Sequence, residues 1–272
     1  MKYDPIKKSL GSFFNTSPAL RKMFYALLNL LLLRTWHVKK EFKKWQKDHR
    51  GKRKILDAGS GFGQYVYLMS HNSDYEVVGV DVKTEQIEDC SRFFDEIGRG
   101  NVDFEYADLT QYRRPETFDF ILSVDVMEHI LEDEKVFENF YHSLKKSGSL
   151  LISTPSDQGG SDVHDHDHES DGETSFIDEH VRDGYNIDDI QKKLKNAGFQ
   201  RTEAYYNYGT PGKISWKISM KYPILLLNSS KVFFVVLPFY YLITFPFALI
   251  LNYMDLHFRH DTGTGLIVRA WK

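Results

Sequence analysis

The sequence of 272 residues predicts an α/β fold: a Rossmann-like, doubly wound sheet of seven mostly parallel strands. Three observations support this prediction. Short β-rich runs alternate with helical segments from residue 54 onward, a glycine-rich turn follows the first run, and an apolar run ends the chain as an antiparallel closing strand. Such alternation gives βαβ units and a sheet that helices cover on both faces.

The N-terminal residues 1–53 are expected to form a basic helical arm. Residues 24–33 are an apolar run too short to span a bilayer. Basic residues follow this run and no small-residue cleavage site does, so helices over 18–36 and 38–49 fit better than a signal peptide.

The remaining residues, 54–272, are expected to form one domain that contains a lid loop and an insertion. An acidic lid loop covers residues 155–186, and an apolar helical insertion covers 212–260, between the last two strands. The expected strands are 55–58, 76–81, 102–107, 118–124, 149–154, 199–208 and 265–271. The expected helices between them are 62–70, 84–97, 132–145 and 187–197.

Composition excludes a disordered chain, since 42% of the residues are apolar. The single cysteine, Cys90, excludes an internal disulfide framework. Charge is divided unevenly: residues 1–54 carry a net +12 and the remainder a net −15. A basic arm of this kind faces lipid or nucleic acid. Lipid fits better, because the lysines accompany a Leu-rich helix rather than exposed aromatic residues.

The first strand and its turn, residues 55–63, read ILDAGSGFG. Glycines here permit a tight turn and a close approach of the backbone to a ligand. A dinucleotide-binding turn would need glycine at position 64, where the chain has Gln64. Asp57, two residues before the first glycine, would repel a pyrophosphate and suits a cationic ligand.

Carboxylates also follow the next three strands. Asp81 ends the second strand, where an acid can accept both hydrogen bonds of a ribose diol. Asp108 follows the third strand, where it can accept a hydrogen bond from an adenine amino group, and Asp125 follows the fourth. Acids at four strand ends in register predict one ligand site at the carboxyl edge of the sheet.

With these motifs the chain resembles the class I S-adenosylmethionine-dependent methyltransferases, in the type 11/12 branch that includes the ubiquinone-biosynthesis O-methyltransferases. The resemblance covers residues 54–199 and the closing strand. It rests on DAGSGFG at 57–63, MEHI at 127–130 and LKKSGS at 144–149, where Lys146 and Ser147 replace the family's Pro and Gly. It implies S-adenosyl-L-methionine as cofactor. The residues it implies for the cofactor are Asp57, Gly59, Ser60, Gly61, Gly63, Asp81, Val82, Asp108, Leu109 and Asp125.

The implied chemistry is displacement of the methyl group from a sulfonium by an acceptor nucleophile. Alignment and desolvation can supply most of the catalysis, and a base is needed only for a protonated acceptor. His129 and His180 are the candidate bases, and each also fits a role in loop packing. Residues 162–169, DVHDHDHE, alternate metal-ligand side chains. A solvated lid is preferred there, and no metal site is expected.

The apolar insertion contains 23 uncharged residues between Lys231 and Asp255. Its length suits a transmembrane helix. One crossing would place the closing strand on the far side of the bilayer, and Pro238 and Pro246 are expected to interrupt the helix. A re-entrant or surface-lying helical hairpin is therefore expected.

Together these features predict a methyltransferase on the cytoplasmic membrane face, peripheral or monotopic, that methylates a small-molecule or lipid-like acceptor at an oxygen. No nucleic-acid partner is expected, and the sequence leaves the oligomeric state open. One alternative is a soluble small-molecule methyltransferase whose insertion covers the pocket or forms a dimer surface. Another is a membrane-tethered module that binds the cofactor without catalysis.

Overall fold

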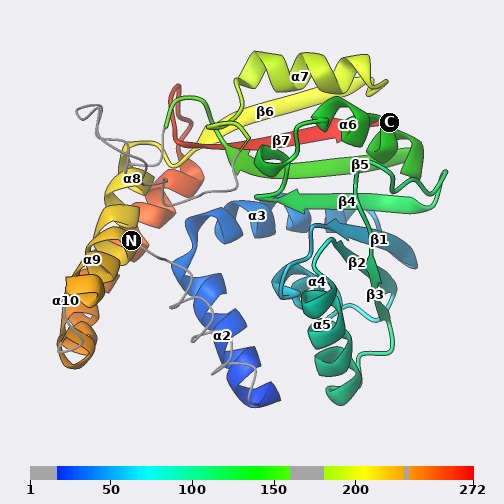
Figure 1. Cartoon of the computed structure of the whole chain (residues 1–272). Helices are drawn as coiled ribbons and strands as arrows, with labels where there is room; N and C mark the ends of the chain where they lie inside the picture. Colours follow the sequence, from blue (N-terminus) through cyan, green and yellow to red (C-terminus); the bar gives the residue numbers. More distant parts are fainter. Residues whose placement is uncertain (1–16, 160–180, 230–232) are drawn as a thin grey trace, which may run out of the picture.

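The computed structural model describes residues 17–159, 181–229 and 233–272. Its seven strands form one sheet in the order β3-β2-β1-β4-β5-β7-β6, with β7 antiparallel to both of its neighbours (Figure 1). The predicted fold class is therefore confirmed. The strands are β1 (Arg53–Ala58), β2 (Tyr75–Asp81), β3 (Val102–Tyr106), β4 (Phe118–Val124), β5 (Leu144–Pro155), β6 (Arg201–Asn207) and β7 (Gly265–Trp271).

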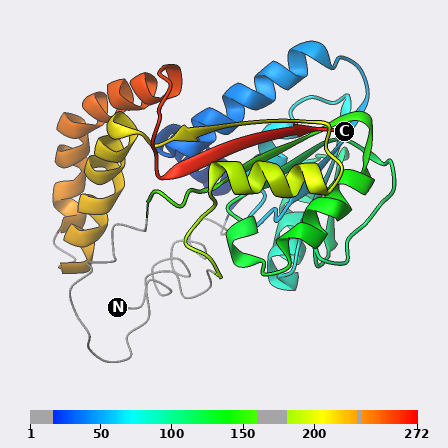
Figure 2. The same ribbon diagram turned by 90° about the horizontal axis from the view of Figure 1, so that it is seen from above.

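Helices cover both faces of the sheet, as Figures 1 and 2 show. α6 (Asp133–Ser143) and α7 (Ile187–Asn196) pack on one face. The other face carries α3 (Leu33–Asp48), α4 (Gln64–Met69) and α5 (Thr84–Glu96). The central strands β1 and β4 are buried along most of their length because helices cover both faces of the sheet.

The N-terminal arm is divided at Leu32 rather than at His37. α2 (Pro18–Leu31) begins at the cap of Ser17, whose side chain accepts a hydrogen bond from the N–H of Leu20. Leu32 is extended, with φ −88° and ψ 110°, so α2 turns away from α3. The expected helix 18–36 was therefore too long.

α3 lies on the sheet through an aromatic cluster. The ring of Phe42 is 5.5 Å from that of Phe120, and the ring of Trp45 is 4.7 Å from it, centroid to centroid. Phe120 belongs to the central strand β4. Lys43, Lys44 and Lys47 of this helix are exposed, whereas Phe42 and Trp45 are buried in this contact.

The insertion between β6 and β7 is a helical hairpin that projects beyond the end of the sheet (Figure 1). Its first arm contains α8 (Thr210–Trp216), the π-helical turn η2 (Lys217–Lys221) and α9 (Tyr222–Ser229). Its second arm is α10 (Phe233–His257). The hydroxyls of Tyr240 and Tyr241 donate to backbone carbonyls of η2, at 2.6 and 2.8 Å.

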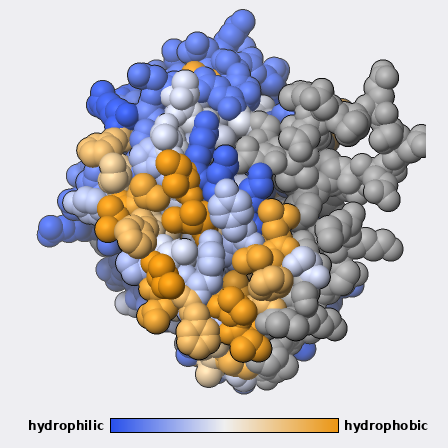
Figure 3. Space-filling model, turned by 90° about the vertical axis from the view of Figure 1, so that its left-hand side faces the viewer, coloured by the Kyte–Doolittle hydropathy of each residue, from blue (hydrophilic) through white to orange (hydrophobic). Residues whose placement is uncertain are grey.

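α10 runs on through Pro238 and Pro246, so the expected interruption of the helix was wrong. Each proline removes one N–H, and the neighbouring arm of the hairpin supports the helix on one side. The other side of α10 is a broad apolar surface (Figure 3).

Candidate active site

The carboxyl ends of β1, β2 and β4 bring the glycine turn and several predicted acids to one edge of the sheet. The parallel register pairs Asp57 with Gly79 on one side and with Leu122 on the other. Asp81 ends the neighbouring strand β2, and Asp125 directly follows β4. The structure therefore brings together acids that lie far apart in the sequence.

The turn between β1 and α4 depends on left-handed glycines. Gly59, Gly61 and Gly63 have φ values of 84°, 51° and 77°. A Cβ on Gly59 would overlap the side chain of Val126, in the loop that leaves β4. The turn and this loop are therefore in direct contact.

Asp81 fixes the turn from the end of β2. Its Oδ2 accepts from the N–H of Gly61 and its Oδ1 from the N–H of Lys83, each at 2.9 Å. A carboxylate oxygen has two lone pairs, so both oxygens keep capacity for a ligand hydroxyl. The ribose role predicted for Asp81 is compatible with this geometry.

Asp108 and Leu109 follow the carboxyl end of β3. Oδ1 of Asp108 accepts hydrogen bonds from the N–H and the hydroxyl of Thr110, both at 2.8 Å. Leu109 is buried, and its carbonyl accepts from Asn139 at 2.9 Å. Val82, next to the end of β2, is exposed.

Asp57 is the most unusual carboxylate of the edge. It is buried, and among the described residues its Oδ2 has no hydrogen-bond partner. Burial, together with the negative charge of Asp81, raises the pKa of Asp57 to about 7. The hydroxyl of Ser60, buried nearby in the turn, also lacks a partner among the described residues. A buried, unsatisfied carboxylate is suited to a cationic ligand, and a sulfonium cofactor that also carries an ammonium group meets that requirement.

The loop after β4 contains two titratable side chains that differ in exposure. It forms the 3₁₀ turn η1 (Met127–His129), in which Glu128 is buried and His129 is exposed. Oε2 of Glu128 accepts from the hydroxyl of Thr154 at 3.1 Å, and burial raises the pKa of Glu128. His129 was a candidate from the sequence, whereas Glu128, the preceding residue of the same motif, was not.

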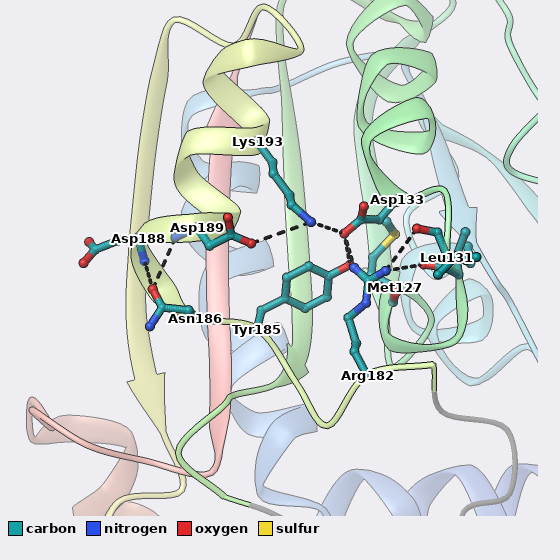
Figure 4. A network of polar contacts seen from close by, with 10 residues as sticks. Met127, Leu131, Asp133, Arg182, Tyr185, Asn186, Asp188, Asp189 and Lys193 are labelled. Atoms are coloured by element: carbon teal, nitrogen blue, oxygen red, sulfur yellow. Dashed lines mark hydrogen bonds and ion pairs between the residues drawn. The ribbon is translucent and has the colours of Figure 1, made fainter.

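A polar network centred on Asp133 supports the loop after β4 (Figure 4). Arg182 pairs with Asp133 and donates to the carbonyl of Ile130 at 2.8 Å. The hydroxyl of Tyr185 lies 2.7 Å from Oδ2 of Asp133 and 3.1 Å from the carbonyl oxygen of Met127. Burial alone would raise the pKa of Asp133, but its hydrogen bonds from Tyr185, Lys193 and Arg182 lower that pKa below its ordinary value. The network therefore fixes the backbone on both sides of Glu128 and His129.

The N-terminal arm closes over the glycine turn. Arg21, which is buried, donates to the carbonyl of Phe62 at 3.0 Å and to Asp89 at 2.6 Å. The hydroxyl of Tyr25 donates to the same carbonyl of Phe62. Sequence reasoning missed this contact, and its one signal was an arginine among the apolar residues of α2.

Arg34, at the start of α3, also reaches the edge. Its guanidinium pairs with Asp125, and its backbone N–H donates to the hydroxyl of Tyr208 at 3.1 Å. The structure thus adds Arg21, Arg34, Tyr208 and Glu128 to the predicted set. His180 and most of the acidic lid, residues 160–180, lie outside the described residues.

Comparison with known proteins gives the family. The family model described as a methyltransferase domain matches residues 49–204. A phosphoethanolamine N-methyltransferase from Triticum aestivum is 32% identical over 149 residues, which are 54% of this chain and 28% of the relative. The mitochondrial ubiquinone biosynthesis O-methyltransferase of Homo sapiens is 30% identical over 105 residues, 37% of this chain and 28% of the relative. The chain therefore spans less than a third of the length of these relatives.

A solved structure has the same fold. Haemonchus contortus phosphoethanolamine N-methyltransferase 2, in complex with S-adenosyl-L-methionine, superposes with a TM-score of 0.61. It is 20% identical, and the match covers 87% of this chain and 52% of that one. The family model covers more than half of the chain, and the matched residues include the glycine turn. The chain belongs to the methyltransferase domain family, within the class I S-adenosylmethionine-dependent methyltransferases that its sequence resembles.

Proposed function

We propose that the carboxyl edge of β1, β2 and β4 binds S-adenosylmethionine and directs its methyl group to an acceptor beside the loop after β4. The observation that carries this proposal is Asp57, a buried carboxylate with an unpaired oxygen beneath the glycine turn. In this arrangement the turn, with Gly59, Ser60, Gly61 and Gly63, lies along the methionine part of the cofactor. Asp81 with Val82 holds the ribose, and Asp108 with Leu109 flanks the adenine.

The cofactor supplies a methyl group on a positively charged sulfur, which is a good leaving group. The protein has to align the acceptor with that methyl carbon and exclude water. Arg21 and Tyr25 serve the second need, because they hold α2 against the glycine turn. Val126 lies against Gly59, and this contact supports a position for the loop after β4 beside the methyl group.

The acceptor atom in this proposal is nitrogen rather than the oxygen that the sequence favoured. The relatives named above include phosphoethanolamine N-methyltransferases. An ammonium group must lose one proton before its nitrogen can form the new bond to carbon. Asp125, Glu128 and His129 surround the proposed acceptor position and are the candidates that receive this proton. Burial raises the pKa of Glu128, which makes its carboxylate a stronger base than an ordinary glutamate.

The apolar face of the hairpin supports action at a membrane. The helix Val235–His257 is long and apolar enough to cross a bilayer, and only 11% of its most apolar window is buried. Its exposed residues follow one helix face: Val235, Phe239, Leu242, Ile243, Phe247, Ile250 and Tyr253. An exposed patch of this extent is typical of a membrane or protein contact.

The pairing of β6 with β7 favours insertion from one side. Asn207 and Gly265, at the two ends of the insertion, are register partners in the sheet. Both ends of the hairpin therefore stay with the methyltransferase domain, on the cytoplasmic side in this proposal. Lys213 and Arg259, near its base, suit an anionic lipid surface.

Incubation of the full chain with methyl-labelled S-adenosylmethionine and a total lipid extract tests this function. Label is expected in an amine-bearing lipid, and mass spectrometry of the product identifies the methylated atom. Label found only in water-soluble acceptors would favour a soluble enzyme whose hairpin forms a dimer or a pocket cover. Cofactor binding without any transfer would contradict catalysis and leave a membrane-tethered binding module.

A further inference from the structure

Two adjoining cavities lie where α2, α3 and α4 meet, each with a volume of about 340 Å³. Leu68 of α4 and His71, which follows that helix, line both of them. Lys22 of α2 lines one cavity, and Lys39 and Lys43 of α3 line the other. Among the described residues, no aspartate or glutamate lines either cavity. Together the two cavities form one basic groove on the surface of the N-terminal arm.

The three lysines of the basic groove have no ion-pair partner in the part of the chain that the structure describes. Lys44, on the same helix α3, differs from them, because it pairs with Glu41 at 2.7 Å. Burial and the positive charge of Lys43 lower the pKa of Lys39 below its ordinary value. The basic groove therefore concentrates positive charge that neighbouring side chains do not neutralise. An anion bound there would relieve this repulsion.

An exposed apolar stripe runs along α2 beside the basic groove. Met23, Leu27 and Leu30 are spaced by four and three residues, so they share one face of the helix. Their exposed fractions are 47, 39 and 42%. Each of them directly follows a residue of α2 that lines the groove, which places the stripe next to it. Inside the groove, Phe42 and Leu68 add apolar surface.

Positive charge beside exposed apolar surface fits an anionic lipid bilayer. Lysines close to acidic phospholipids gain electrostatic attraction, and apolar side chains gain by entering the boundary between head groups and acyl chains. A small soluble anion would use the lysines only and would leave the apolar stripe in water. Nucleic acid would do the same, since α2 presents no exposed aromatic residue on which a base could stack.

We propose that the basic groove and the apolar stripe of α2 together dock on an anionic bilayer, with acidic head groups among Lys22, Lys39 and Lys43. This contact is separate from the apolar face of α10, and Figure 1 shows that α2 and the hairpin extend away from the sheet in the same direction. Arg21 of α2 donates to the glycine turn, so the docking surface belongs to a helix that also supports the proposed cofactor site. The inference goes beyond the proposed function, because neither the cofactor nor the methyl acceptor takes part in it.

Flotation of the full chain with vesicles tests the proposal. Vesicles of pure phosphatidylcholine are compared with vesicles that also contain phosphatidylglycerol. The groove variant loses the three lysines of the groove: Lys22→Gln, Lys39→Gln and Lys43→Gln. The matched control loses the same charge at three exposed lysines of β5 and α7, outside the groove: Lys146→Gln, Lys192→Gln and Lys195→Gln. A single substitution, Leu27→Gln, tests the apolar stripe.

The wild type and the control should bind the mixed vesicles at least about tenfold more tightly than the neutral ones, and added salt should reduce this preference. The groove variant should bind the two kinds of vesicle within about twofold of each other, because the apolar face of α10 remains. Leu27→Gln should weaken binding to the mixed vesicles several-fold. Equal circular dichroism spectra and melting temperatures show that all four proteins are folded.

The same preference for mixed vesicles in the wild type and the groove variant would overturn the proposal. A wild type that binds both kinds of vesicle equally would overturn it as well. A single-stranded oligonucleotide that binds the wild type but not the groove variant, without any vesicle preference, would assign the groove to nucleic acid instead. Absence of methyl transfer would contradict the proposed function alone, because flotation does not depend on turnover.

Discussion

Gly59 lies against Val126, so closely that a Cβ on this glycine would overlap Cγ2 of the valine. This contact joins the turn after β1 to the loop after β4, the two segments that hold the cofactor and the acceptor in our account. Gly59→Ala should weaken the binding of S-adenosylhomocysteine more than tenfold, because the left-handed backbone becomes strained and the two segments must separate. Isothermal titration calorimetry measures this effect.

Gly51→Ala is the matched control for that substitution. Gly51 has a similar φ of 79°, but a Cβ there would have no heavy atom within 4 Å. It should cost about 1 kcal/mol of stability through backbone strain and leave cofactor affinity unchanged. Equal losses of affinity in the two variants would show that the contact with Val126 has no part in binding.

Asp57 should make the stability of the ligand-free protein depend on pH. Its folded pKa of about 7 lies above the ordinary value of 3.8, so the folded state holds its proton more tightly than the unfolded state does. The free energy of unfolding should therefore fall as the pH rises from about 4 to about 7, by up to about 4 kcal/mol. Urea unfolding of the wild type and Asp57→Asn measures this contribution as their difference at each pH.

Asp57→Asn should remove that dependence and also weaken cofactor binding. The variant gains relative stability above pH 7 because no buried carboxylate has to ionise there. A difference between the two proteins that stays constant from pH 4.5 to 8 would show that Asp57 has an ordinary pKa. Unchanged cofactor affinity in Asp57→Asn would show that Asp57 does not contribute to cofactor binding.

The strand-end acids show how much of the site the sequence predicts. Parallel strands joined by helices place their carboxyl ends at one edge, so chain order alone brings Asp57, Asp81 and Asp125 together. The glycine turn is equally local, because its conformation depends on residues adjacent in the chain. These features required no knowledge of how distant helices pack.

The contributions of the N-terminal arm could not be predicted in the same way. Arg21 and Tyr25 reach the carbonyl of Phe62, and Arg34 reaches Asp125, only because α2 and α3 meet at a bend at Leu32. That bend is a tertiary feature, since leucine favours a continuous helix. The sequence pattern showed a basic arm, whereas the structure places two of its arginines at the candidate site.

Asp133 should control activity through the position of the loop after β4. Asp133→Asn removes the charge that pairs with Arg182 and Lys193, and leaves these two cations without their shared partner. The expected results are a loss of about 3 kcal/mol or more in unfolding free energy and a lower kcat, with little change in cofactor affinity. Urea unfolding and steady-state kinetics test both expectations.

Asp189→Asn is the control for that variant, because the exposed Asp189 also pairs with Lys193, at 3.6 Å. It should change the unfolding free energy by less than about 1 kcal/mol. Similar kcat values for wild type and Asp133→Asn would mean that the network stabilises the fold without positioning the loop.

Leu242→Glu should release the protein from membranes. Leu242 is 76% exposed on the apolar face of α10, where a charge is unfavourable in contact with lipid. Sedimentation with anionic vesicles should fall several-fold relative to wild type. Leu131→Glu is the control, since Leu131 is also 76% exposed but lies on the loop after β4. Equal sedimentation of all three proteins would contradict a membrane role for the hairpin.

The edge formed by β1, β2 and β4 is proposed to bind S-adenosylmethionine. Equilibrium dialysis of the full chain with labelled S-adenosylmethionine tests it most directly, with Gly51→Ala and Gly59→Ala measured in parallel. Saturable binding of one molecule per chain is expected in the wild type and Gly51→Ala, with a more than tenfold loss of affinity in Gly59→Ala. No saturable binding by the wild type, or equal binding by all three proteins, would contradict it.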